Sequence, residues 1–255
     1  MAASPVLPAS PEPAAYAPPL SQGARVVNTF IAPSKTFTDL RRDASWWAPF
    51  LLMTVVTTLF VFMVGQKMGF RKVTETQVEL SPKQSAQLDN LPADQREQQM
   101  QQRTKVTRIV SYIVPLFVLV FWVIIAAALF ATFKFVAGAD VSFKVAFAIV
   151  VFAGLPQVLK SLLATIAVLA GVSGDSFSFQ NPIATNPGFL LNPVDSPFWY
   201  SVASALDIFM IWTLALTALG FTYVSKVKRG TAFVIVFGWW LMLTLLGAGM
   251  AAMFS

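Results

Sequence analysis

Five long apolar runs divide this chain, and each is long enough to cross a lipid bilayer. A membrane-spanning helix needs about 20 consecutive apolar residues. The runs that reach this length are Trp46–Gly65, Ile109–Phe133, Val145–Val172, Trp199–Val224 and Thr231–Phe254. Only 12% of the residues are charged, against about 25% in soluble domains. The sequence therefore predicts an all-α polytopic membrane bundle of five transmembrane helices.

Several classes of chemistry are excluded by composition. The chain has no cysteine and no histidine, which rules out thiolate catalysis, mixed Cys/His zinc sites and a Ser-His-Asp triad. No phosphate-binding loop of the form GxxxxGK[ST] occurs, and the apolar runs hold no paired carboxylates. We therefore expect a protein that is not an enzyme and that holds no cofactor and no metal.

The part of the chain that precedes the first run divides into two segments. Residues 1–24 are rich in proline and alanine and predict a disordered tail. Residues 25–45 alternate aromatic and aliphatic side chains with basic ones, which is typical of an amphipathic helix at the membrane interface. We expect Ser34 to cap this helix. Residues 25–255 then form one membrane domain.

Two longer loops separate the runs. Residues 66–108 contain nine glutamines and predict two helical pieces on the membrane surface, one starting at Ser81-Pro82 and one near Pro92. Residues 173–198 contain three Asn-Pro pairs, which favour turns. This second loop either folds back over the helix ends at the interface or forms a lid over a cavity.

Basic residues in short loops indicate orientation, because cytoplasmic loops carry an excess of lysine and arginine. The segment Lys226-Val-Lys-Arg229 is basic, whereas residues 173–198 carry no lysine or arginine. The eight basic residues of loop 66–108 weigh in the other direction. The short loops favour a cytoplasmic N-terminus. The net charge of +6 is interpreted as contact with lipid headgroups, and no nucleic-acid partner is expected.

Lys160 and Asp207 lie deep inside the third and fourth runs. A charged residue at the centre of a bilayer costs about 2.5–3.5 kcal/mol on insertion scales and usually faces a partner or a polar cavity. Their predicted depths, about 18 and about 12 Å, lie within reach of a lysine side chain. Helical side chains lean toward their own N-terminus, however, which tips the two groups apart in antiparallel helices.

Pro156 lies one turn before Lys160, removes a helical hydrogen bond and should free the carbonyl of Phe152. Gln157 adds a polar group at the predicted kink. Two interpretations of this candidate intramembrane polar site, formed by Lys160, Asp207, Pro156 and Gln157, remain open. It is either a structural ion pair that fixes helix register or a site for an ion, a proton or a lipid headgroup.

Four stretches give the chain a family resemblance. They are Phe30-Ile-Ala-Pro-Ser-Lys-Thr-Phe37, Trp46-Trp-Ala-Pro49, Gly154-Leu-Pro156, and Thr185-Asn-Pro-Gly-Phe-Leu-Leu191 followed by Leu206-Asp-Ile-Phe-Met-Ile-Trp212. Over about residues 25–255 the chain resembles a Yip1-domain protein in its bacterial form, which implies five spans with a cytosolic N-terminus. Eukaryotic relatives are linked to Rab GTPases and carry Asp-Leu-x-Gly-Pro before the first span. The matching segment here, Asp43-Ala-Ser-Trp-Trp-Ala-Pro49, departs from that pattern, which argues against a Rab-type partner.

Together these observations predict a multi-pass integral protein of a bacterial inner membrane. We expect it to contact the bilayer and other membrane proteins, and to organise the membrane or act as an adaptor. The alternative is a small transporter, or an accessory subunit of an export system, that uses the polar site at Lys160 and Asp207.

Overall fold

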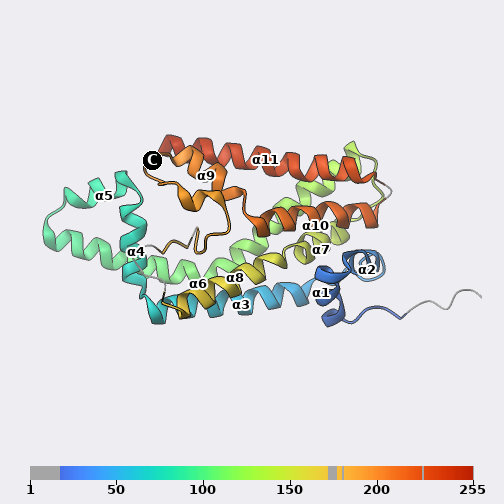
Figure 1. Cartoon of the computed structure of the whole chain (residues 1–255), viewed down its shortest axis with the longest axis horizontal. Coiled ribbons are helices and arrows are strands. Elements are labelled where there is room, and N and C mark those ends of the chain that lie inside the picture. Colours follow the sequence, from blue (N-terminus) through green and yellow to red (C-terminus); the bar gives the residue numbers. More distant parts are fainter. Residues whose placement is uncertain (1–17, 172–176, 180, 226, 255) are drawn as a thin grey trace, which may run out of the picture.

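The computed structural model describes residues 18–171, 177–179, 181–225 and 227–254, and within these residues all the regular structure is helical (Figure 1). The elements in chain order are α1 (Gln22–Ile31), α2 (Pro33–Asp39), α3 (Trp47–Lys67), α4 (Phe70–Glu79), α5 (Pro82–Asp89), α6 (Ala93–Ala131), the π-helical turn η1 (Thr132–Val136), α7 (Phe143–Ala153), α8 (Pro156–Leu169), the 3₁₀ turn η3 (Pro187–Leu190), α9 (Pro197–Ala205), α10 (Ile208–Val224) and α11 (Arg229–Phe254).

The predicted all-α membrane architecture is confirmed. Four helical stretches of the described chain are long and apolar enough to cross a membrane: Trp47–Lys67, Ala93–Val136, Phe143–Leu169 and Arg229–Met253. The pair α9 and α10, bent by 53°, meets the same criteria of length and hydropathy when the two helices are taken together as one span. The fourth predicted span is therefore a broken helix rather than a continuous one.

The two ends of the bundle carry different headpieces (Figure 1). We call the end with α1 and α2 the proximal end; the turn between α10 and α11 lies there as well. The distal end carries α4, α5 and the C-terminal end of α11. Successive spans therefore run in alternating directions, as expected of a chain that crosses a membrane repeatedly. Lys226, part of the basic segment that argued for orientation, lies outside the described residues.

Helix α6 is much longer than the predicted second span. Its 39 residues extend about 58 Å at 1.5 Å per residue, roughly twice the hydrocarbon thickness of a bilayer. The predicted helix starts at Pro82 and near Pro92 are confirmed as α5 and α6. Helix α4, which packs against α6, was missed. The three helices together form the distal headpiece.

Helix α7 lies at the centre of the proximal half. Every residue from Ala146 to Ala153 is buried, as expected of a helix that is apolar on all sides. The ring of Phe133 in η1 stacks on Phe221 of α10, with centroids 3.9 Å apart. The main core therefore lies beneath α1 and α2, which close the proximal end.

The N-terminal segment contains two helices instead of the one expected. Helix α1 begins at Gln22, with the Ser21 hydroxyl accepting a hydrogen bond from the backbone N–H of Ala24 at 3.2 Å. The predicted cap at Ser34 is wrong, because α2 begins at Pro33, a residue whose missing N–H suits the first helical turn. The predicted tail boundary at residue 24 falls inside α1, and residues 1–17 lie outside the described chain.

Candidate functional site

Asp207 lies at the break between α9 and α10. Its backbone is extended, with φ −76° and ψ 134°, and it caps α10. Its Oδ1 accepts hydrogen bonds from the backbone N–H groups of Phe209 at 3.0 Å and Met210 at 3.2 Å. A helix start inside the bundle leaves N–H groups without carbonyl partners, and the carboxylate satisfies two of them.

The second oxygen of Asp207 joins two further segments to this break. Oδ2 accepts hydrogen bonds from Lys160 Nζ of α8 at 2.8 Å, from the Thr185 hydroxyl, and from Asn186 Nδ2 at 3.5 Å. The Thr185 carbonyl in turn accepts the backbone N–H of Ile208 at 3.2 Å. Asp207 is only 3% exposed, so α8, α10 and the loop before α9 meet at one buried carboxylate.

The direct contact shows that the side-chain lean predicted for Lys160 and Asp207 did not decide their geometry. That expectation assumed that both residues lie inside regular helices. Asp207 instead occupies an extended residue at a helix start, where the lean of helical side chains does not apply.

The loop before α9 borders a cavity, as one of its two predicted forms had it, and also extends into the bundle. Phe177 is buried, and its ring lies 6.3 Å from that of Phe60 on α3. Further along, Asn181 and Asn186 exchange amide hydrogen bonds of 3.2 and 2.8 Å. The loop therefore contributes Thr185 and Asn186 to the polar site. Residues 173–176 and 180, which the same prediction included, and Val172, the predicted end of the third span, lie outside the described chain.

Pro156 interrupts the third span as predicted, but its effect on the backbone differs. Helix α7 ends at Ala153 and α8 begins at Pro156. The carbonyl of Phe152, predicted to be free, accepts the N–H of Leu155 at 3.1 Å. A tighter turn thus takes up the hydrogen bond that proline removes. The Nε2 of Gln157 donates to the Thr213 hydroxyl of α10 at 3.3 Å, which adds a second polar link to α10.

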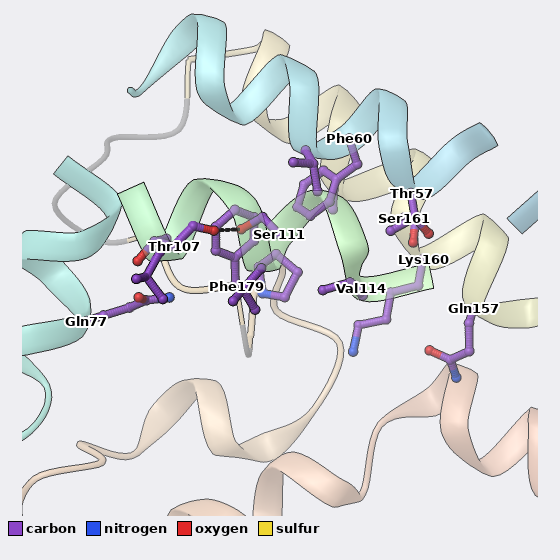
Figure 2. Close-up of a pocket in the computed structure, with 15 residues that line it drawn as sticks. Thr57, Phe60, Gln77, Thr107, Ser111, Val114, Gln157, Lys160, Ser161 and Phe179 are labelled. Carbon is purple, nitrogen blue, oxygen red and sulfur yellow. Dashed lines mark hydrogen bonds between the residues drawn. The ribbon is translucent and has the colours of Figure 1, made fainter. Parts of the chain in front are cut away.

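Lys160 also borders two cavities. The distal cavity, of about 480 Å³, lies among α3, α4, α6, α8 and the loop before α9 (Figure 2). The lateral cavity, of about 470 Å³, lies among α6, α8, α9, α10 and α11. Among the described residues, Lys160 and Gln157 line both. The side chain of Lys160 is 18% exposed, compared with 4% for Asp207.

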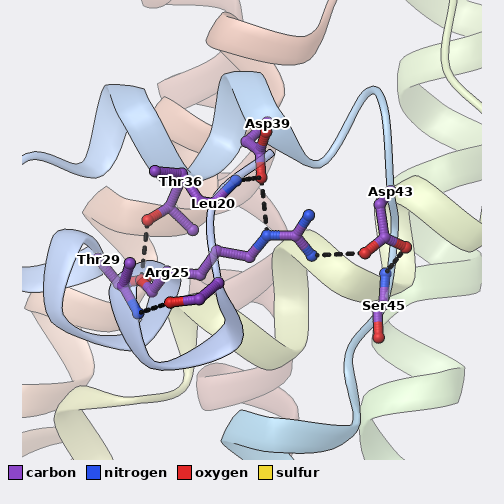
Figure 3. Close-up of polar contacts among 9 residues, drawn as sticks. Leu20, Arg25, Thr29, Thr36, Asp39, Asp43 and Ser45 are labelled. Carbon is purple, nitrogen blue, oxygen red and sulfur yellow. Dashed lines mark hydrogen bonds and ion pairs between the residues drawn. The ribbon is translucent and has the colours of Figure 1, made fainter. Parts of the chain in front are cut away.

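A second buried charge cluster lies in the proximal headpiece (Figure 3). Arg25 is 1% exposed; its Nε donates to Asp39 Oδ2 at 2.8 Å and its Nη1 to Asp43 Oδ2 at 3.0 Å. The carbonyl of Arg25 accepts the hydroxyls of Thr29 and Thr36, both at 2.8 Å. Arg25 belongs to residues 25–45, whose basic side chains were expected on the polar face of an interfacial helix; for Arg25 this expectation is wrong, because its guanidinium is buried between α1 and α2.

The sequence matches the Yip1 domain over residues 27–251. The chain belongs to the Yip1 domain family. No curated protein matches the chain, and no solved structure matches it either. The family, the helical fold and the apolar spans together make this an integral, multi-pass membrane protein.

Thr185 and Asn186 are site residues of this Yip1 domain that were not predicted from the sequence. A signal was present, because the stretches Thr185–Leu191 and Leu206–Trp212 both carried the family resemblance. Their pairing in space follows from the hydrogen bonds to Asp207. Two stretches of one resemblance therefore form one contact in the fold.

The hydrogen-bond donors and acceptors at the Lys160–Asp207 site determine which ligands this Yip1 domain can hold. Among the described residues, no group of three acidic side chains could hold a metal ion. Asp207 accepts hydrogen bonds from two backbone groups and three side chains. Lys160 has three N–H donors and faces two cavities. The carboxylate is thus committed to the fold, while the ammonium retains donors for a ligand.

Proposed function

We propose that this Yip1-domain protein is a non-enzymatic membrane adaptor that organises other membrane components. It would lie in a bacterial inner membrane with its proximal end in the cytoplasm. The observation that carries the proposal is the complete engagement of Asp207 by α8, α10 and the loop before α9. A charge used in this way fixes the relative positions of helices, which a scaffold needs.

Transport through the same site is the competing function. A transporter that cycles a proton or cation through Asp207 would have to replace its hydrogen bonds in each cycle. Buried polar networks lose much of their stability when they are only partly satisfied. Asp207 has five donors within one chain, and this argues for the structural role of the pair.

The distal headpiece supports the adaptor role. Gln95 and Gln98 lie exposed on the polar part of α6, beyond the length needed to cross a bilayer. Amide side chains both donate and accept hydrogen bonds, and carry no charge that must be desolvated. This surface suits contact with a second membrane protein.

The structural role of the ion pair can be tested by substitution in proteoliposomes. Removing one partner of a buried pair costs about 3–5 kcal/mol, whereas an apolar replacement of both is often close to neutral. Lys160→Met and Asp207→Asn should each lower the unfolding temperature, and the double variant should recover part of the loss. Ion flux through the reconstituted protein should equal that of empty liposomes. A flux that disappears in a stably folded Lys160→Met variant would establish transport instead.

The adaptor role needs a separate test. A photo-crosslinking residue at Gln98 should give a discrete cross-linked membrane protein in cells. The matched control is Ile124, which lies on the same helix, is 59% exposed and belongs to the apolar span. Cross-links from Ile124 alone would move the contact surface into the bilayer, and cross-links from neither position would contradict an adaptor that uses α6.

A further inference from the structure

The two cavities that meet at Lys160 differ in chemistry. The distal cavity is lined by hydroxyl and amide groups together with apolar side chains; its polar residues include Thr57, Gln77, Thr107, Ser111 and Ser161. The lateral cavity is lined mainly by aromatic and aliphatic residues, including Trp122, Ile125, Trp239 and Trp240. Asp207, Thr213 and Thr217 of α10 line the lateral cavity as well. The distal cavity is therefore the more polar of the two, and Lys160 and Gln157 lie on the boundary between them.

The distal cavity continues toward the polar end of the molecule. A third cavity, of about 300 Å³, is lined by glutamines of α4, α5 and α6 and by Arg103. It shares Gln77 and Thr107 with the distal cavity. The two cavities therefore adjoin at Gln77 and Thr107, and polar side chains line both.

The lateral cavity opens toward lipid near the middle of the spans. Phe121 of α6 is 55% exposed and Leu243 of α11 is 39% exposed, and both also line this cavity. Each lies near the centre of its apolar run. An acyl chain from the surrounding bilayer can therefore enter between α6 and α11 without passing through a polar region.

The charge at the junction favours an anion. The carboxylate of Asp207 is shared among two backbone N–H groups of α10, Thr185, Asn186 and Lys160. Lys160 and Asp207 carry opposite formal charges that cancel, and the N-terminus of α10 adds a partial positive charge, so the site keeps a small positive excess. Figure 2 shows Lys160 and Gln157 extending to the same side of α8, where both could donate to one oxyanion.

We propose that this junction binds one anionic phospholipid. Its phosphate contacts Lys160 Nζ, its headgroup occupies the distal cavity, and one acyl chain lies in the lateral cavity. The volumes of about 480 and 470 Å³ fall within the range of ligand pockets, about 300–1,000 Å³. Charge-assisted hydrogen bonds to phosphate are short and strong. The inference goes beyond the adaptor function and does not rest on it.

The test is native mass spectrometry of the full chain, freed of lipid and held in detergent. The probes are phosphatidylglycerol, phosphatidylcholine with the same acyl chains, and inorganic phosphate. We expect one retained phosphatidylglycerol per chain at limiting lipid, and neither of the other two probes. Lys160→Met should weaken retention by about tenfold or more, because it removes the charged donor. Lys160→Arg should retain the lipid.

Matched controls separate this site from lipid attracted to any exposed charge. Lys144→Met removes an exposed lysine at the start of α7 and should leave retention unchanged. Leu243→Trp should fill the lateral cavity and weaken retention without touching the ion pair. Leu241→Trp adds the same bulk on α11 at a residue that is 50% exposed and does not line the cavity, so it should have no effect.

Three results would overturn the proposal. Unchanged retention in folded Lys160→Met would remove the lysine from the site. Unchanged retention in Leu243→Trp would exclude the acyl chain from the lateral cavity. Binding of inorganic phosphate as tight as that of phosphatidylglycerol would show a site for a soluble anion. If Lys160→Met fails to fold, the comparison of Leu243→Trp with Leu241→Trp still decides the outcome.

Discussion

The proximal and distal headpieces use the same chemical device in opposite environments. In each, one arginine contacts two carboxylates: Arg25 binds Asp39 and Asp43, and Arg71 binds Glu75 and Glu97. The side chain of Arg25 is 1% exposed, whereas that of Arg71 is 53% exposed. The geometry of an ion pair therefore does not indicate how much the fold depends on it.

The difference in burial changes what each pair can contribute. Exposed ion pairs add little to the free energy of unfolding, because water and salt screen them. A buried ion pair stabilises the fold little more than apolar residues of similar size would. Removing one partner, however, leaves the other charge in a medium that cannot solvate it. We infer that assembly of α1 and α2 depends on Arg25, whereas without Arg71 the helices α4 and α6 would stay packed together but vary more in their separation.

Arg25→Met should have the largest effect. It leaves Asp39 buried without its cation and removes a long side chain from the centre of the headpiece. The expected loss is about 3–5 kcal/mol of unfolding free energy, measured by denaturant titration in mixed micelles. Asp43→Asn is the graded control, because that side chain is 49% exposed, and it should cost much less. Equal losses of unfolding free energy in Arg25→Met and Asp43→Asn would show that burial does not determine the size of the loss.

A pair of glycines gives a second and smaller contrast between the two ends. A Cβ on Gly220 of α10 would lie 2.5 Å from Ile149 Cγ2 and 3.1 Å from the ring of Phe37, both in the proximal core. Gly220→Ala should therefore cost about 1–3 kcal/mol through overpacking. At the distal end, a Cβ on Gly65 would meet only the outer atoms of the Phe70 ring, at 2.6 Å, and this ring can turn aside.

Thermal unfolding of both alanine variants checks this contrast. Gly65→Ala should lose less than Gly220→Ala, because alanine also favours the helix by about 0.5–1 kcal/mol. Gly238→Ala on α11, where no atom lies within 4 Å of the added Cβ, measures that propensity gain by itself. If Gly65→Ala lost as much thermal stability as Gly220→Ala, the two ends of the bundle would be packed with equal rigidity.

The spans could be predicted because their signal is local. Length and hydropathy place α3, α11 and the apolar part of α6 directly. The break before α10 was missed because Ala205, Leu206 and Asp207 include neither glycine nor proline. Aspartate is a favoured helix cap, so Asp207 offered a weak signal for a helix start. The continuous apolar run around it concealed that signal.

The partners of the buried charges depend on tertiary structure and could not be predicted in the same way. Arg25 meets acids 14 and 18 residues away, and both lie beyond the end of α1, so the spacing of residues within one helix does not link them. Asp207 meets Thr185 only because the loop before α9 extends into the bundle. The sequence located the charges at Lys160 and Asp207 correctly, while their contacts required the fold.

Loss of the Arg71–Glu97 ion pair at the distal end should have the smallest effect on stability. The pH dependence of this effect distinguishes it from the others. Hydrogen bonds from Arg71 and from Gln101 lower the pKa of Glu97 from 4.5 to about 2. A lowered pKa means that this contribution to stability is present above pH 4.5 and is lost as the pH falls toward 2. At pH 7, Arg71→Met should leave the unfolding temperature within experimental error, since both side chains are exposed.

Spin labels can resolve this local effect, because the chain has no cysteine of its own. Labels at Glu79→Cys on α4 and Gln95→Cys on α6 would report the distance between the helices by electron resonance. The distribution should broaden as the pH falls from 4.5 to 2, and should be broad at every pH in Arg71→Met. The Arg96–Asp89 contact, at 3.7 Å, is present in both proteins and therefore does not contribute to the difference between them. Identical pH profiles with and without Arg71 would show that α4 is held on α6 by packing alone, which would place the distal headpiece closer to the proximal one.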